Sequence, residues 1–147
     1  MRVYIAIYTW VAVVVEDSVD RDPEEWQHFV PRFYSGQEQS GEIARGWDYC
    51  LRLCYEHFHP KPASFIIAAS LNFTNMTILT GCEMPRMART ASAKGSLWAH
   101  YVRQKDGIGE VYAWFTFPKE RYPDISLFME VIPDIEDVID QVNDILS

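Results

Sequence analysis

Residues 62–80, PASFIIAASLNFTNMTILT, contain no charged side chain over a length that is typical of a helix. A helix that is apolar on every side is usually buried at the centre of a domain. Pro60 and Pro62 stand at the start of the run and Gly81 follows it, so both ends carry residues that interrupt regular structure. We therefore predict that residues 62–80 form a central helix around which the rest of the chain packs.

Apolar residues recur at helical spacing on both sides of this central segment. Residues 37–58 present one apolar side, and residues 127–146 follow the helical period closely. Asp124 is a suitable N-cap for the second of these helices. Pro133 falls inside its pattern and is expected to kink or split it, because proline lacks the backbone N–H.

The remaining segments also favour helices. Residues 3–15 are rich in Val, which is typical of a strand, but no hairpin turn or second alternating strand lies nearby. Residues 94–117 indicate two helical pieces that are broken near Gly107 and Gly109. We predict a single all-α domain that covers residues 1–147.

Composition excludes several classes of protein. The 147 residues suit one domain, and the net charge of −8 disfavours nucleic acid and anionic membranes as partners. Three cysteines without a C-x-x-C pair disfavour a disulfide scaffold and a structural zinc site. The apolar run at residues 3–15 is too short to span a bilayer and continues into Glu16 and Asp17 without a cleavage site, so we expect a cytoplasmic protein.

An acidic cluster, Glu16-Asp17-Ser18-Val19-Asp20, directly follows this first apolar run. Glu16 and Asp20 are four residues apart and share one face of a helix. Mg²⁺ is commonly held by one or two carboxylates together with phosphate oxygens of a substrate. Taken alone, such a cluster is more often a solvated helix end.

Two further clusters lie in the second half of the chain. In the last five residues, Asn143-Asp144-Ile145-Leu146-Ser147, the first and last share a helix face, although a short match of this kind is usually a polar stripe. Arg103, Asp106 and Gly107 combine a guanidinium, which binds phosphate oxygens in bidentate fashion, with a glycine break in the helix. Taken alone, this third cluster is an ordinary charged helix end.

The order of the three clusters resembles that of the class I terpene cyclases, and within them the trichodiene synthase type of fungi. That family has a D-D-x-x-D motif or close variant, then an Arg, an acidic residue and a Gly, then N-D-x-x-S-x-x-x-E. The run Phe115-Thr116-Phe117-Pro118-Lys119-Glu120 and the later Ser126-Leu127-Phe128 are also similar to stretches of this type. The resemblance covers essentially the whole chain and implies an incomplete class I terpenoid synthase helical bundle.

The resemblance implies a role for each cluster. The expected Mg²⁺ ligands are Glu16, Asp17, Asp20, Asn143 and Ser147. Glu16 and Asp20 are expected to face Asn143 and Ser147 across an open cavity. Arg103 and Asn143 are expected to bind the substrate, and Arg103, Asp106 and Gly107 to act as diphosphate sensor, linker and effector. Glu16 stands where the family has Asp, and the Glu of the last motif would lie beyond Ser147.

The implied reaction is Mg²⁺-assisted ionisation of a prenyl diphosphate, namely farnesyl diphosphate, followed by cyclisation of the carbocation. An apolar, aromatic cavity would stabilise that cation, with Trp10, Phe73 and Trp114 as candidate wall residues. The family's catalytic domain is more than twice as long, so the chain is expected to be a central fragment with little or no turnover. A homodimer is compatible with the sequence.

Two other interpretations remain open at this point. The chain would be a non-catalytic remnant if it keeps the helical core without a complete metal site. It would be an unrelated helical interaction module if its acidic stripe, which includes Asp137, Asp140 and Asp144, meets a basic partner.

Overall fold

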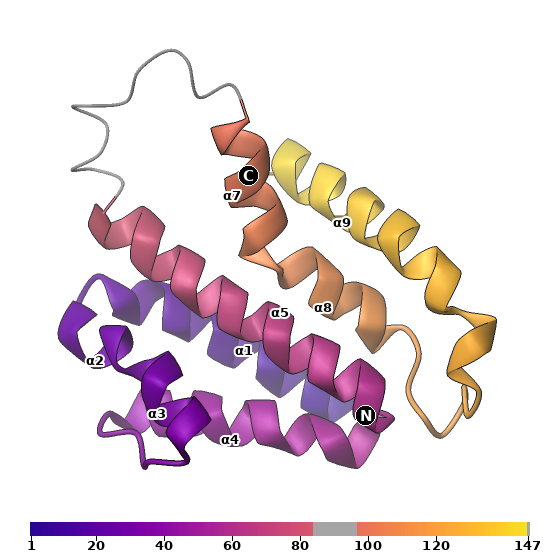
Figure 1. The fold of residues 1–147 in the computed structure, drawn as a ribbon, viewed down its shortest axis with the longest axis horizontal. Helices are drawn as coiled ribbons and strands as arrows, with labels where there is room; N and C mark the ends of the chain where they lie inside the picture. The colour runs from indigo at the N-terminus through magenta and orange to yellow at the C-terminus, as the bar shows by residue number, and fades with distance from the viewer. Residues whose placement is uncertain (84–96, 147) are drawn as a thin grey trace.

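The computed structural model describes residues 1–83 and 97–146, and within these ranges the chain is helical and has no strand (Figure 1). The predicted all-α fold is therefore confirmed. The α-helices are α1 (Arg2–Val19), α2 (Pro23–Gln27), α3 (Phe29–Ser35), α4 (Glu42–His57), α5 (Pro60–Ile78), α7 (Trp98–Asp106), α8 (Ile108–Phe115) and α9 (Ile132–Leu146). A π-helical turn, η1 (Leu79–Glu83), extends α5, and two 3₁₀ turns, η2 (Ile125–Leu127) and η3 (Met129–Val131), precede α9.

The central position predicted for residues 62–80 is confirmed. Helix α5 lies between α1 and α4 on one side and α7 and α8 on the other, and it contacts all four (Figure 1). The helix begins at Pro60, two residues earlier than predicted, with proline in its first turn. Proline is tolerated there because the first N–H groups of a helix have no partner within the helix.

Residues Pro60–Gly81 are long and apolar enough for a membrane span, with a mean hydropathy of 1.3. This is the one segment of the described chain that meets the criterion, and 44% of its most apolar window is buried within the bundle. Core helices have the same length and composition, so the match is weak evidence for a span.

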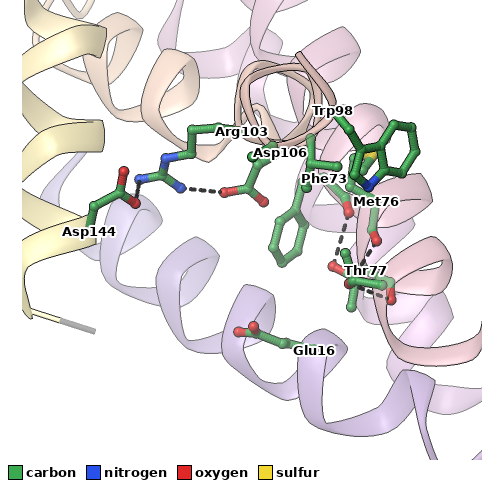
Figure 2. Close-up of a pocket in the computed structure, with 11 residues that line it drawn as sticks. Glu16, Phe73, Met76, Thr77, Trp98, Arg103, Asp106 and Asp144 are labelled. Atoms are coloured by element: carbon green, nitrogen blue, oxygen red, sulfur yellow. Dashed lines mark hydrogen bonds and ion pairs between the residues drawn. The ribbon is translucent and has the colours of Figure 1, made fainter. Parts of the chain in front are cut away.

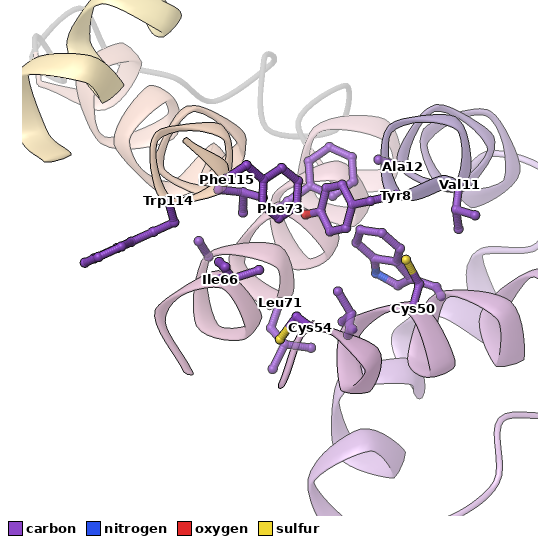
Figure 3. Packing of buried hydrophobic residues seen from close by; sticks show 14 of the residues in the cluster. Tyr8, Val11, Ala12, Cys50, Cys54, Ile66, Leu71, Phe73, Trp114 and Phe115 are labelled. Carbon is purple, nitrogen blue, oxygen red and sulfur yellow. The ribbon is translucent and has the colours of Figure 1, made fainter. Parts of the chain in front are cut away.

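Buried hydroxyl groups join α5 to its neighbours. The indole Nε1 of Trp47 on α4 donates to Thr74 Oγ1 at 3.0 Å, and the hydroxyl groups of Tyr8 and Ser70 are 2.6 Å apart. All four side chains are fully buried. These bonds satisfy polar groups that would otherwise be costly inside an apolar core (Figure 3 shows the surrounding packing).

Replacement of Thr74 by Val is expected to lower the free energy of unfolding by about 1–3 kcal/mol, because the buried Trp47 N–H loses its acceptor. Urea denaturation checks this value. Thr77→Val is the matched control, since the Thr77 hydroxyl donates to the Phe73 carbonyl of its own helix at 3.0 Å. Equal effects of the two substitutions would contradict a role for the bond between α4 and α5.

Two predicted helices differ from the structure at their first residues. Helix α4 begins at Glu42, whereas we predicted a start at residue 37. Helix α9 begins at Ile132, so Pro133 lies in its first turn and starts the helix; the prediction that it kinks or splits a longer one is wrong. The Asp124 side chain accepts from the Ser126 N–H at 3.0 Å and caps the short turn η2.

Helix α1 confirms the helix predicted for residues 3–15 and continues to Val19, so it carries the first residues of the acidic cluster. Its inner face packs Tyr8, Val11 and Ala12 into the core (Figure 3). Cys50 and Cys54 lie in the same core as free thiols, as expected for small buried residues. Burial raises the pKa of Cys50 to about 11 and that of Cys54 to about 12.

Helices α7 and α8 meet at Gly107, as the predicted break indicated. Gly107 has a φ of 72°, and a Cβ at this position would overlap the Ala69 carbonyl oxygen and lie 3.0 Å from its carbon. Glycine adopts this left-handed backbone conformation readily and has no Cβ that would overlap the Ala69 carbonyl group. The close approach to α5 fixes the end of α7, where Arg103 and Asp106 are located.

Candidate active site

A cavity of about 480 Å³ lies between α1, α5, α7 and the C-terminal part of α9 (Figure 2). This volume falls within the range of small-molecule sites, roughly 300–1,000 Å³. The cavity lining has an apolar part and a charged part. The largely apolar part, here called the wall, consists of Phe73, Met76, Thr77, Thr80, Trp98, Ala99 and Val102, and the charged part, here called the mouth, consists of Glu16, Arg103, Asp106 and Asp144.

The wall combines one of the predicted aromatic residues with one that was missed. Phe73 is buried and lines the cavity, as expected. Trp10 is 67% exposed on the outer face of α1, and Trp114 stacks on Phe65 in the core, so both expectations are wrong. Trp98 lines the cavity instead. Trp98 and Val102 are four residues apart and share one face of α7, and this spacing could have identified Trp98 from the sequence.

Arg103 is the centre of the charged mouth. Its Nη1 donates to Asp106 Oδ2 at 3.0 Å, and its Nη2 lies 3.0 Å from Asp144 Oδ1 on α9 (Figure 2). Its Nη2 also donates to the Asp140 carbonyl oxygen at 2.8 Å. The Nε atom is buried and has no hydrogen-bond partner. Arg103 therefore joins α7 to α9 and keeps one buried donor unsatisfied.

Negative charge exceeds positive charge around this guanidinium. Burial raises the pKa of Asp106; Arg103 opposes that rise, and Asp140, Glu16 and Asp144 add to it. Asp140 shows the same pattern, because burial raises its pKa and Arg103 opposes the rise. Among the residues that the structure describes, four carboxylates thus lie near Arg103, and this excess of negative charge favours the binding of a further cation.

The donors at the mouth fit Mg²⁺ only with help from a ligand. Glu16 and Asp144 supply one carboxylate each from the first and the last sequence cluster, and Mg²⁺ commonly takes one or two carboxylates plus phosphate oxygens. Within residues 1–83 and 97–146, no group of three or more His, Cys, Asp or Glu side chains is arranged to hold a metal ion. The protein groups alone therefore form an incomplete site.

The structure brings some of the predicted site residues together and leaves others aside. Glu16, Arg103 and Asp106 line one cavity, whereas Asp17, Asp20 and Asn143 are absent from its described lining. The Asp20 carboxylate lies against Gly81, where its Oδ1 is 2.5 Å from the place of a Cβ. Ser147 lies outside the described residues, so the arrangement predicted for Asn143 and Ser147 opposite the acidic cluster stays a prediction.

Two functional candidates were missed at the sequence level. Asp144 stands in the last cluster, but only its neighbours were predicted as ligands; the structure places its carboxylate at the mouth. Asp140 lies one helical turn earlier and was considered only as part of the acidic stripe that includes Asp137 and Asp144. Their four-residue spacing puts both on one face of α9, and that was the available signal.

Comparison with known proteins gives the class to which this site corresponds. No protein-family model matches the chain. Over its whole length the chain is 36% identical to longiborneol synthase of Gibberella zeae and 35% identical to terpene synthase BipA of Cochliobolus sativus. It is also 29% identical, over 99% of its length, to monoterpene synthase 25 of Postia placenta.

The chain is therefore similar along its entire length to fungal terpene synthases, which confirms the predicted resemblance at the level of the family. The chain spans 44% of the longiborneol synthase and 45% of BipA, less than half the length of these curated relatives. The trichodiene synthase type is not singled out by these relatives and stays a prediction.

Proposed function

We propose that this chain contributes the diphosphate-binding part of a Mg²⁺-dependent terpene cyclase site that ionises farnesyl diphosphate. One observation carries the proposal: Glu16, Arg103 and Asp144, from three separate sequence clusters, line one largely apolar cavity. The similarity to terpene synthases supports a prenyl diphosphate as the ligand class. The trichodiene synthase type, a homodimer and a cytoplasmic location belong to the same proposal.

Each part of the cavity has a role in this reaction. Arg103 lines the cavity and offers its positive charge to a diphosphate oxygen, which stabilises charge on the departing group. Glu16 and Asp144 would hold Mg²⁺, which when bound neutralises charge on the leaving diphosphate. Phe73 and Trp98 lie on the wall where an isoprenoid chain would rest, and aromatic faces stabilise a carbocation.

Sequence similarity and site geometry bear differently on the two rival interpretations, the interaction module and the non-catalytic remnant. Similarity to terpene synthases along the whole chain argues against an unrelated interaction module. A non-catalytic remnant stays a specific alternative, because Arg103 is already neutralised by Asp106 and Asp144 and the protein metal donors are few. Binding and turnover separate this alternative from a cyclase.

Titration calorimetry with Mg²⁺ and inorganic pyrophosphate tests the binding part of the proposal. Mg²⁺ alone is expected to bind weakly, since the protein offers few ligands. Pyrophosphate should tighten Mg²⁺ binding, and Mg²⁺ should tighten pyrophosphate binding by the same factor, because the coupling is reciprocal. Tight Mg²⁺ binding without pyrophosphate would contradict the proposed division of ligands.

Arg103→Ala is expected to weaken pyrophosphate binding in the presence of Mg²⁺ by about tenfold or more, the value of a charge-assisted hydrogen bond. Arg45→Ala is the control, because Arg45 likewise donates to a main-chain carbonyl, that of Ser40 at 2.6 Å, but lies away from the cavity. Equal affinities of the two variants would remove Arg103 from the proposed site.

A further inference from the structure

We propose that Gly109 and Asp140 are positioning residues for Arg103: the missing side chain of Gly109 lets Asp140 approach α8, and Asp140 then holds the guanidinium. The inference rests on the proposed function, in which Arg103 binds the diphosphate. It concerns the contact between α8 and α9, outside the three sequence clusters.

Gly109 leaves space for a side chain of α9, whereas Gly107 adopts a backbone conformation that favours glycine. Gly109 is buried in α8, and the described glycines with positive φ are Gly36 and Gly107. A Cβ on Gly109 would overlap Asp140 Oδ1 and lie 2.8 Å from Cγ and 3.3 Å from Oδ2. The Asp140 carboxylate therefore rests directly on the backbone of α8.

This close contact determines where α9 meets Arg103. The Asp140 carbonyl oxygen accepts from Arg103 Nη2 at 2.8 Å, and the Asp140 carboxylate Oδ1 lies 3.5 Å from the same nitrogen. Asp144, one turn further on, pairs with Nη2 at 3.0 Å. These contacts of Asp140 and Asp144 with the guanidinium thus depend on how closely α9 approaches α8.

The result is a guanidinium whose two terminal nitrogens are both held by neighbouring residues. Arg103 Nη1 donates to Asp106, Nη2 donates to the Asp140 carbonyl oxygen on α9, and the buried Nε has no hydrogen-bond partner. A donor that is fixed before its ligand arrives loses less conformational freedom on binding and so binds more tightly. We expect an Ala at position 109 to push the Asp140 carboxylate and the backbone of α9 away from α8, which lengthens the contacts that α9 makes with Arg103 Nη2.

Pyrophosphate titration in the presence of Mg²⁺ tests this arrangement. Gly109→Ala is expected to bind pyrophosphate about tenfold more weakly than the parent, the loss of one well-placed charged donor. The double variant Gly109→Ala with Asp140→Ala should recover the parent affinity to within about threefold. Removal of the carboxylate makes room for the new Cβ, and Ala still supplies the main-chain carbonyl at position 140.

Gly46→Ala is the matched control, because Gly46 lies in helix α4 and a Cβ there meets nothing within 4 Å. Its pyrophosphate affinity should equal that of the parent. Gly109→Ala at parent affinity, while Arg103→Ala is weakened, would overturn the inference and leave the proposed function intact. Equal binding by Arg103→Ala and the parent would overturn the proposed function alone.

NMR spectra recorded without pyrophosphate test whether Gly109 and Asp140 position Arg103, whatever the titrations show. In nitrogen-15 NMR spectra, the Arg103 guanidinium should show slowly exchanging N–H signals, identified by their loss in Arg103→Lys. These signals should disappear in Gly109→Ala and return in the double variant. Asp140→Glu, which lengthens the side chain where it meets Gly109, should also remove them if Gly109→Ala does not fold. Signals that persist in both single variants would overturn the inference.

Discussion

Incubation of the 147-residue chain with farnesyl diphosphate and Mg²⁺ is expected to release little or no cyclic product. Ionisation requires positive charge directed at the departing diphosphate, and Arg103 is the arginine at the cavity mouth. Its charge is already countered by Asp106 and Asp144, each 3.0 Å away. Each absent donor or metal contact costs a few kcal/mol, roughly a hundredfold or more in rate.

Access of water lowers the expected yield further. In the described part of the chain, Glu16 and Asp144 are exposed, and Trp98 on the wall is 38% exposed. A carbocation formed in an open cavity reacts with water before it cyclises, which closed active sites prevent. The expected loss of product therefore combines weak ionisation with quenching of the cation.

Gas-chromatographic analysis of volatile products measures this expectation directly. A reaction mixture without protein is the control for spontaneous breakdown of farnesyl diphosphate. A cyclic sesquiterpene formed at a rate that is ordinary for an enzyme would contradict the prediction. It would also exclude the non-catalytic remnant and show that these 147 residues are sufficient.

Gly107→Ala is expected to lower the free energy of unfolding by about 3 kcal/mol or more. The left-handed conformation, with φ of 72°, costs an alanine roughly 1–2 kcal/mol. The new Cβ would also overlap the carbonyl group of Ala69 in the central helix, and such overpacking costs about 1–3 kcal/mol. The backbone of α5 cannot move without disturbing the helices packed around it.

Urea denaturation of Gly107→Ala and Gly46→Ala in parallel gives the measurement and its control. Gly46 is exposed in α4 with open space around it, so alanine there should stabilise the protein by about 0.5–1 kcal/mol through helix propensity. The two substitutions are thus expected to have opposite signs. A Gly107→Ala protein as stable as the parent would show that the α7–α8 junction can leave α5 at little cost.

Helix content and the central helix could be predicted from the sequence because both depend on local patterns. Residues 62–80 lack charge over a helix length, and the structure buries α5 between its neighbours. The break between α7 and α8 at Gly107 could also be predicted, since glycine often interrupts a helical pattern. The error at Pro133 has a local cause: the same residue can end a helix or begin one.

The identity of the residues around Arg103 could not be derived in this way. Helical spacing shows that Asp140 and Asp144 share a face, but it does not show which helix that face meets. The same limit explains the wrong expectations for Trp10 and Trp114. Helix α1 carries apolar residues on both its inner and its outer face, so periodicity cannot choose between them.

The sequence by itself determined the class of fold, the order of the charged clusters and the similarity to terpene cyclases. These properties depend on residue types and on spacing along one helix. Tertiary structure alone decided that Glu16, Arg103 and Asp144 share a cavity mouth and that Asp140 rests on Gly109. Such contacts join helices far apart in the chain, and their geometry follows from the packing of whole helices, which no local pattern contains.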